Sequence, residues 1–168
     1  MTDSENSCTR KPRLSVVLIE PDIPQNTGTL IRLAACMDVA IHIIHPTGFT
    51  FSDAQLRRAG MDYAQHAKII EHDSFAVFEE WRRQKSARLV LLTTKASQSA
   101  YEAGFTENDI LLLGRESAGV PQSVADAADL RLRIPMAQNM RSLNVAISGA
   151  MILGEALRQT ASLPPLAS

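Results

Sequence analysis

The sequence is short of the residues on which several protein classes depend. It has two cysteines, Cys8 and Cys36, without C-x-x-C spacing, so neither a disulfide framework nor a cysteine zinc site is expected. No apolar run approaches the roughly 20 residues that cross a bilayer, and the polar residues 1–13 show no signal-peptide pattern. Its 17 basic and 18 acidic residues give a net charge of −1, which excludes nucleic-acid binding by bulk charge alone. These absences predict a cytoplasmic enzyme or binding domain with no metal and no membrane partner.

The length and apolar content suit one compact domain. The chain has 168 residues, of which 45% are hydrophobic, enough to enclose one core. The Ser-, Thr- and Lys-rich start and the Pro-containing end read as tails. We therefore predict a disordered tail over 1–12, a single domain over 13–160 and a flexible tail over 161–168.

Short apolar runs alternate with longer helical patterns along the chain. The runs are rich in Leu and β-branched residues and continuously apolar, as in parallel strands buried on both faces: Leu14–Ile19, Val39–Ile44, Leu89–Leu92, Ile110–Leu113 and Leu130–Ile134. The helical patterns fall near Asn26–Met37, Ser52–Ala59, Ser74–Gln84, Gln122–Ala127 and Ser142–Thr160. This alternation predicts an α/β fold with a mostly parallel sheet flanked by helices. Ligands of such sheets bind at the carboxyl ends of the strands, so the loops there are the candidates for chemistry.

The loop after the first predicted strand holds two prolines, Asn26 and, one turn apart on a helix face, Gly28 and Arg32. Asn26 is able to cap the following helix, and Gly28 to leave room for a substrate. Arg32 would then reach a phosphate or a hydroxyl. The alternative is that Asn26 is only a cap and Arg32 only a surface charge.

Two later loops carry similar features. Gly114 at a strand end permits a ligand to approach the backbone, and Glu116 places a carboxylate beside it. The loop matches neither a P-loop nor G-x-G-x-x-G, and an ordinary turn is the alternative. The third loop leads to a helix expected to begin at Ser142, with Asn144 in its first turn and its N–H groups free for a polar ligand. Glycines inside that helix predict close packing against another backbone.

Taken together, these segments resemble the SPOUT superfamily of S-adenosylmethionine-dependent RNA methyltransferases. The matching words are EPDIPQNTGTLIRLAA, HPTGF, LRRAGMDY, LTTK, LLLGRESAGVP, IPM and RSLNVAISGAMILGEALRQ, in family order. The nearest likeness is to the small single-domain enzymes that methylate the ribose 2′-oxygen of the tRNA wobble nucleotide, position 34, a cytidine or uridine. The resemblance implies a C-terminal deep trefoil knot, a homodimer with active sites built from both chains, and the anticodon stem-loop of tRNA as substrate.

The resemblance also implies roles for particular positions. Leu92, Gly114, Ile134 and Ser142 match cofactor-binding positions, and Asn26, Arg32, Glu116 and Asn144 match catalytic ones. Arg57, Arg58 and Arg141 are the RNA-binding candidates, whereas the run from Arg82 to Arg88 reads first as a solvated helix face. The four histidines read as structural or surface residues. The sequence departs from the pattern at Arg115, where relatives have proline, and at Gly154, where they carry a tyrosine associated with RNA.

The implied chemistry is methyl transfer to a 2′-hydroxyl, in which the protein mainly aligns the reacting groups. Arg32 stays protonated, so we expect it to fix a phosphate and polarise the hydroxyl rather than take a proton. Glu116 or Asn144 would orient the proton acceptor. Two alternatives remain: 2′-O-methylation of ribosomal RNA, and a knotted RNA-binding module without catalysis.

Overall fold

The computed structural model describes residues 14–52, 54 and 62–166 of the chain. Strands and helices alternate along it. In chain order they are β1 Ser15–Ile19, α1 Pro24–Cys36, β2 Ala40–Ile44, the 3₁₀ helix η1 Asp62–Gln65, β3 Lys68–His72, α3 Phe75–Gln84, β4 Arg88–Leu92, β5 Asp109–Leu113, α4 Gln122–Ala127, β6 Leu130–Leu132 and α5 Val145–Gln159.

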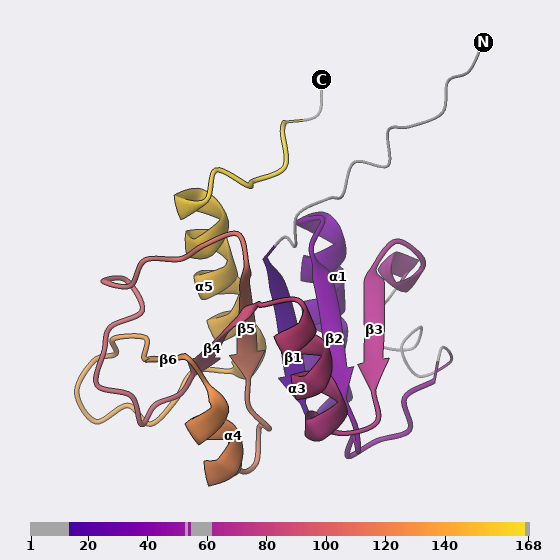
Figure 1. Cartoon of the computed structure of the whole chain (residues 1–168), viewed down its shortest axis with the longest axis horizontal. Coiled ribbons are helices and arrows are strands. Elements are labelled where there is room, and N and C mark those ends of the chain that lie inside the picture. The colour runs from indigo at the N-terminus through magenta and orange to yellow at the C-terminus, as the bar shows by residue number, and fades with distance from the viewer. Residues whose placement is uncertain (1–13, 53, 55–61, 167–168) are drawn as a thin grey trace.

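The strands form one parallel sheet in the order β3-β2-β1-β5-β4-β6 (Figure 1). β1, β2 and β3 run outward to one edge, and β4 lies on the other side with β5 inserted between it and β1. The predicted α/β class and parallel sheet are confirmed. The trefoil knot that the resemblance implies stays a prediction.

Helices cover both faces of the sheet, which explains why the strands are continuously apolar. Alternate strand residues point to opposite faces. Val16 and Leu18 pack with α1 and α5, whereas Val17 and Ile19 pack with α3 and α4. Figure 1 shows α3 and α4 in front of the sheet, with α1 and α5 behind it. The core is therefore two apolar layers with the sheet between them.

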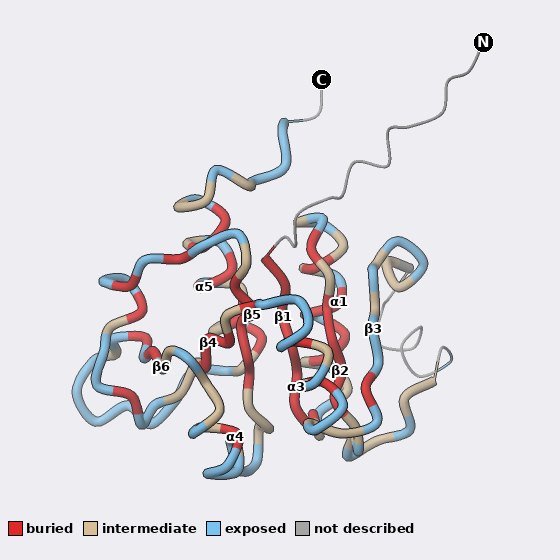
Figure 2. The backbone as a smooth tube through the Cα atoms, viewed as in Figure 1, coloured by how far each residue is buried: buried red, intermediate tan, exposed pale blue. Residues whose placement is uncertain are grey.

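The sequence missed one strand, β3, and the reason is its place at the edge. β3 pairs only with β2. Its residues Lys68, Glu71 and Ile70 are exposed, so it lacks the apolar run that marks the inner strands. Figure 2 shows β3 largely exposed beside the buried β1, β2 and β5. The helix predicted over Ser52–Ala59 lies mostly outside the described residues.

Two helix starts differ from the sequence prediction. α1 begins at Pro24, with Ile23 as its N-cap, so Asn26 lies inside the first turn and does not cap the helix. Proline suits a first helical position because its missing N–H has no partner there in any case. α5 begins after Asn144, not at Ser142, because the Asn144 side chain accepts from the backbone N–H groups of the first turn. The predicted start at Ser74 is confirmed as the N-cap of α3.

The two glycines of α5 have different surroundings. A Cβ at Gly149 would lie 2.8 Å from both Leu113 Cδ1 and Leu30 Cδ2, so the helix sits too close to β5 and α1 for a side chain. The prediction of close packing is therefore right for Gly149, although side chains rather than a backbone make the contact. It is wrong for Gly154, which is exposed and has open space around its Cβ position.

Part of the basic run Arg82–Arg88 is buried, contrary to the prediction of a solvated helix face. Arg82 is only 7% exposed and donates to Glu79 at 2.6 and 2.7 Å, to Asp129 at 2.8 Å and to the Ala87 carbonyl. Arg88 forms a bidentate pair with the buried Asp109. The Arg82 pair ties α3 to Asp129, just before β6, and the Arg88 pair ties β4 to β5, which makes both structural.

Two of the histidines are structural as well. His42 on β2 and His72 on β3 are buried, and their ring nitrogens lie 2.9 Å apart. The rings pack against Phe78 and Trp81 of α3. Burial and the neighbouring His72 lower the pKa of His42 to about 4, so it stays neutral near pH 7. His45 and His66 lie nearer the surface, where His45 pairs with Glu71.

The buried ion pairs of α3 generate a prediction about stability. Arg82→Met should lower the free energy of unfolding by roughly 3 kcal/mol, because it removes the buried donor that Glu79, Asp129 and the Ala87 carbonyl share. Arg83→Met is the matched control. Arg83 pairs with the same Glu79 but its side chain is 75% exposed, so the loss should stay below about 0.5 kcal/mol. Urea unfolding followed by circular dichroism measures both, and equal losses would contradict the assignment.

Candidate active site

A cavity opens at the carboxyl ends of β1, β4, β5 and β6. Its volume is about 460 Å³, within the range of small-molecule sites. The order of the sheet explains its position: β5 and β4 lie next to one another and β6 beside them, so the loops that follow these strands meet at one edge. The three loops singled out in the sequence all contribute to its wall.

The four predicted cofactor-binding residues all line this cavity. Leu92 ends β4, Gly114 follows β5, Ile134 follows β6, and Ser142 precedes α5. Leu91, Leu113 and Leu132 add apolar surface between them, and the hydrogen-bonded side chains of Asn26, Glu116 and Asn144 make another part of the lining polar. A wall with both apolar and polar parts suits a ligand with an aromatic base and a charged tail.

Residue 114 has to be glycine because another part of the same loop packs against it. A Cβ there would lie 2.9 Å from the backbone carbon of Gly119, closer than side chains approach a backbone. The loop folds back at this point, because the Arg115 N–H donates to Gly119 O at 2.9 Å and the Gly119 N–H donates to Arg115 O at 2.7 Å. Gly119 has a φ of 68°, which favours glycine. The approach of Gly119 explains why residue 114 is glycine, and because Gly114 also lines the cavity, its contact with a ligand stays a prediction.

A chain of hydrogen bonds joins the three loops at the polar end of the cavity. The Asn144 amide donates to Asn26 Oδ1 at 2.9 Å, and Asn26 Nδ2 lies 3.5 Å from Glu116 Oε1. The backbone N–H of Asp22 donates to Glu116 Oε2 at 2.9 Å. The direction of each bond is fixed, because Asn144 Oδ1 already accepts from the N–H groups of Ala146 and Ile147. Three predicted catalytic residues therefore form one connected group.

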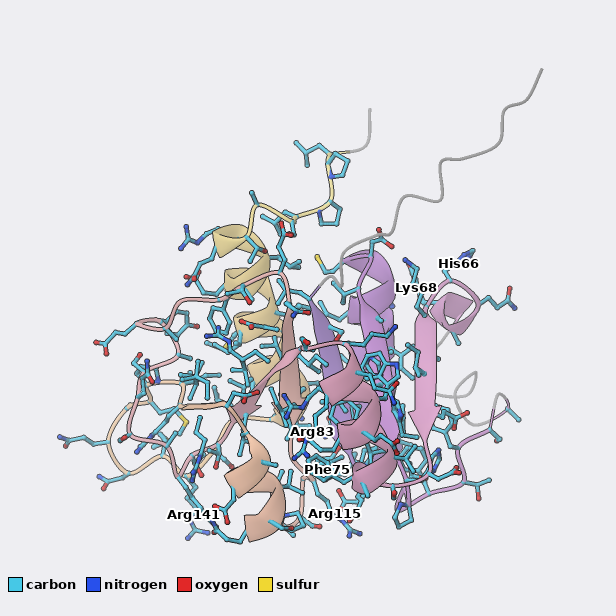
Figure 3. The ribbon with its side chains drawn as sticks, in the orientation of Figure 1. His66, Lys68, Phe75, Arg83, Arg115 and Arg141 are labelled. Atoms are coloured by element: carbon cyan, nitrogen blue, oxygen red, sulfur yellow. The ribbon has the colours of Figure 1, made fainter. Side chains whose placement is uncertain are left out.

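Asp22 belongs to this group, and the sequence analysis did not single it out. Arg115 Nε donates to Asp22 Oδ2 at 3.1 Å, and the same guanidinium lies 3.9 Å from Glu20. Figure 3 shows Arg115 at the carboxyl-end edge of the sheet. Arg115, a departure from the family pattern, thus links the loop after β5 to the loop after β1. The only signal in the sequence was the acidic residues themselves: Glu20 and Asp22 in the loop after β1, and Glu116 in the loop after β5.

The two carboxyl groups, Asp22 and Glu116, have opposite pKa shifts. Burial and the side chain of Asp22 raise the pKa of Glu116 above its usual range. Hydrogen bonding with Glu116, then with Ser117 and Arg115, lowers the pKa of Asp22. The pair therefore holds one tightly ionised carboxylate beside one with increased proton affinity.

The predicted basic residues lie apart from this group. Arg32 is exposed on α1, does not line the cavity and stacks over the ring of Tyr63, 4.5 Å from its centroid. Arg141 is exposed in the loop before α5 (Figure 3). Arg57 and Arg58 lie outside the described residues. Arg133 lines the cavity and was missed, because it falls at the end of a predicted strand.

Neither a metal cluster nor a membrane span occurs in the described part of the chain. No group of three or more His, Cys, Asp or Glu side chains among those residues could hold a metal ion. No helix in the same residues is long and apolar enough to cross a membrane.

The double role of Asn144 can be separated by substitution. Asn144→Asp should keep the free energy of unfolding near wild type, because a carboxylate still caps α5. It should nevertheless turn the Asn26 amide around, since it has no N–H to donate. Asn144→Ala should lose both roles and about 1 kcal/mol of stability. Urea unfolding and the side-chain amide resonance of Asn26 report the two effects; an unmoved resonance in Asn144→Asp would refute the link.

Comparison with known proteins agrees with this geometry. The sequence profile of the SpoU rRNA Methylase family matches residues 13–154. A curated relative from Ancylobacter novellus, named tRNA (cytidine(34)-2′-O)-methyltransferase, is 56% identical over 88% of this chain and 93% of its own length. A relative of the same name from Escherichia coli (strain K12) is 39% identical over 87% of this chain and 93% of its own length.

Solved structures share the fold. One, described as "Structural insights into the 2-OH methylation of C/U34 on tRNA", has a TM-score of 0.82 at 42% identity and covers 88% of this chain and 97% of its own. An AdoMet-bound rRNA methyltransferase from Sinorhizobium meliloti has a TM-score of 0.80 at 29% identity, over 89% of this chain and 57% of its own. The profile match, the sequence identities and the shared fold show that this chain belongs to the SpoU methylase family.

Proposed function

We propose that this protein transfers the methyl group of S-adenosylmethionine to the ribose 2′-oxygen of the wobble nucleotide, position 34, of tRNA. The observation that carries the proposal is the convergence of three loops on one cavity, with Asn26, Glu116 and Asn144 joined at its polar end. The relatives named for this reaction span nearly the same length of chain. A tRNA substrate supports a cytoplasmic location as part of this proposal.

The cavity suits the proposed cofactor. Leu92 and Ile134 supply apolar surface for the adenine, and Gly114 exposes backbone groups beside it. Ser142 and the polar loop before α5 lie where a charged methionine tail needs hydrogen bonds. When bound, the cofactor supplies an activated methyl group and a good leaving group. The protein then has to hold the ribose hydroxyl in line with that methyl group.

The remaining roles belong to the polar side chains. Asn144 orients Asn26, and Asn26 in turn holds one oxygen of Glu116. Arg32 is the proposed phosphate-binding residue. Arg32 does not line the cavity of its own protomer and stacks on Tyr63, so it would act on RNA bound at the cavity of a second protomer. Arg141, with Arg57 and Arg58, would contact RNA phosphates, a mode of binding that weakens steeply with salt.

The proposed homodimer has a candidate surface on α5. Ile147 and Met151 lie one turn apart on α5 and are 51% and 38% exposed, and Leu143, just before the helix, is 39% exposed. An exposed apolar stripe of this kind is typical of an interface. Leu143 also lines the cavity, so a protomer packed on this stripe would reach the site. This arrangement supports active sites built from both chains.

Methyl transfer by an Arg32 variant tests the proposed function. Arg32→Ala should lower the rate of tRNA methylation by about 10²–10³-fold, because a transition-state donor is lost. Its affinity for S-adenosylmethionine should not change, since Arg32 lies outside the cavity. Mass spectrometry maps the methylated nucleotide, and calorimetry measures cofactor binding. Wild-type protein that methylates ribosomal RNA but not position 34 of tRNA would overturn the substrate, and unchanged turnover would remove Arg32 from the site.

The oligomeric state tests the α5 surface. Met151→Glu should convert a dimer to a monomer, because it places a charge within the apolar stripe. Leu163→Glu is the matched control: Leu163 is 52% exposed but lies beyond the helix, and its variant should remain dimeric. Size-exclusion chromatography with light scattering measures the mass of each. A wild-type monomer, or a dimeric Met151→Glu variant, would contradict the proposal.

A further inference from the structure

Two carboxyl groups from loops far apart in sequence lie against each other at the cavity. Asp22 follows β1 and Glu116 follows β5, and they are 94 positions apart. The Asp22 loop is held firmly, since the Gly48 N–H donates to Pro21 O at 2.8 Å and a Cβ at Gly48 would lie 2.6 Å from Asp22 Cβ. Arg115 binds Asp22 from the other side at 3.1 Å. The position of Asp22 beside Glu116 is therefore set by packing and by an ion pair.

Glu116 is the only side chain lining the described cavity that is able to take a proton near neutral pH. The other ionisable groups of the wall are Arg115 and Arg133, which are already protonated. Asn26 and Asn144 carry amides, which are not bases. The Asp22 N–H donates to Glu116 Oε2, and the Asn26 amide lies 3.5 Å from Oε1, so the carboxyl group is held in place from the protein side while it lines the cavity.

We propose that Glu116 accepts the proton of the ribose 2′-hydroxyl and that Asp22, whose N–H binds the Glu116 carboxyl, is its positioning residue. The inference rests on the proposed methyl transfer and names its proton acceptor. Asp22 does not line the cavity, so it acts through Glu116 alone.

The charges around Glu116 explain why one carboxyl of the pair is singled out. Asp22 and Glu20 approach from the loop after β1, Arg115 is its neighbour in sequence, and Arg133 lies on the wall from β6. Arg115 forms its ion pairs with Asp22 and Glu20, and none with Glu116 occurs among the described residues. Glu116 experiences burial and the negative charge of Asp22, and both favour its protonated form. A base of increased proton affinity is suited to general-base chemistry.

The step balances without any further reactant. The 2′-oxygen forms a bond to the methyl carbon as the bond from that carbon to sulfur breaks, and the electron pair of the broken bond stays on sulfur. The hydroxyl proton passes to the Glu116 carboxylate, which becomes a carboxylic acid. That acid returns its proton to water before the next turnover.

The first test titrates Glu116 directly, without cofactor or RNA. Carbon-13 NMR of the glutamate carboxyls should show Glu116 with a pKa above that of an ordinary glutamate. Asp22→Asn should lower this pKa, because it removes the neighbouring negative charge. The control, Glu107→Gln, makes the same charge change at an exposed position before β5, at the opposite end of the sheet, and should leave it unmoved. An unshifted Glu116 signal in Asp22→Asn would overturn the role of Asp22.

The second test is the pH dependence of single-turnover methyl transfer with saturating S-adenosylmethionine and tRNA. The wild-type rate should rise with pH to a plateau, with a midpoint set by Glu116. Asp22→Asn should shift that midpoint to lower pH, in step with the NMR titration. Glu116→Gln, which keeps an oxygen for the Asp22 N–H, should lose the limb and about 10²–10⁴-fold in rate, with cofactor affinity retained.

The outcomes separate the inference from the proposed function. Methylation by Glu116→Gln at the wild-type rate would overturn the inference alone. The inference would also be overturned if the midpoint of the pH–rate profile did not move in Asp22→Asn although the Glu116 pKa measured by NMR did. Wild-type protein that transfers no methyl group to any RNA would overturn the proposed function and the proton transfer with it, whereas the titration would still report the carboxyl pair.

Discussion

The hydrogen-bond chain from Asn144 through Asn26 to Glu116 is the contact on which the candidate site depends. Asn144 caps α5 with its oxygen and reaches α1 with its amide. Because the cap fixes which atom is the donor, every later bond in the chain has a set direction. The start of one helix thus determines the orientation of a carboxylate in a loop on the far side of the cavity. A change at any member would be felt by the others.

The packing beneath the cavity gives this chain its precision. Gly149 allows α5 to lie directly on Leu113 and Leu30, which brings Asn144 within reach of Asn26. Gly114 allows the loop after β5 to fold back on Gly119, which sets the position of Glu116. Because neither glycine has a side chain, two segments of the chain approach each other more closely at each position. The packing of the core therefore sets the positions of Asn144, Asn26 and Glu116. These polar side chains add little to that packing.

The arginine side chains have different partners in the two halves of the molecule. On the α3 side, Arg82 and Arg88 are enclosed by carboxylates and serve the fold. Near the cavity, Arg115 is shared between two carboxylates, and Arg141 forms no ion pair within the described residues. A chain with almost no net charge can still offer local positive charge where an exposed arginine such as Arg141 has no carboxylate partner in the described part of the chain.

The sequence by itself determined five of the six strands, the parallel sheet and the loops that line the cavity, because continuous apolar runs and strand-end motifs are local patterns. It failed at β3, whose exposure at the edge removes that pattern, and at Arg82, whose burial depends on residues from other elements. Only the tertiary structure decided that Asn144 meets Asn26 and that Asp22 meets Glu116. Contacts across 94 and 118 positions follow from the order of strands in the sheet, and no local spacing specifies that order.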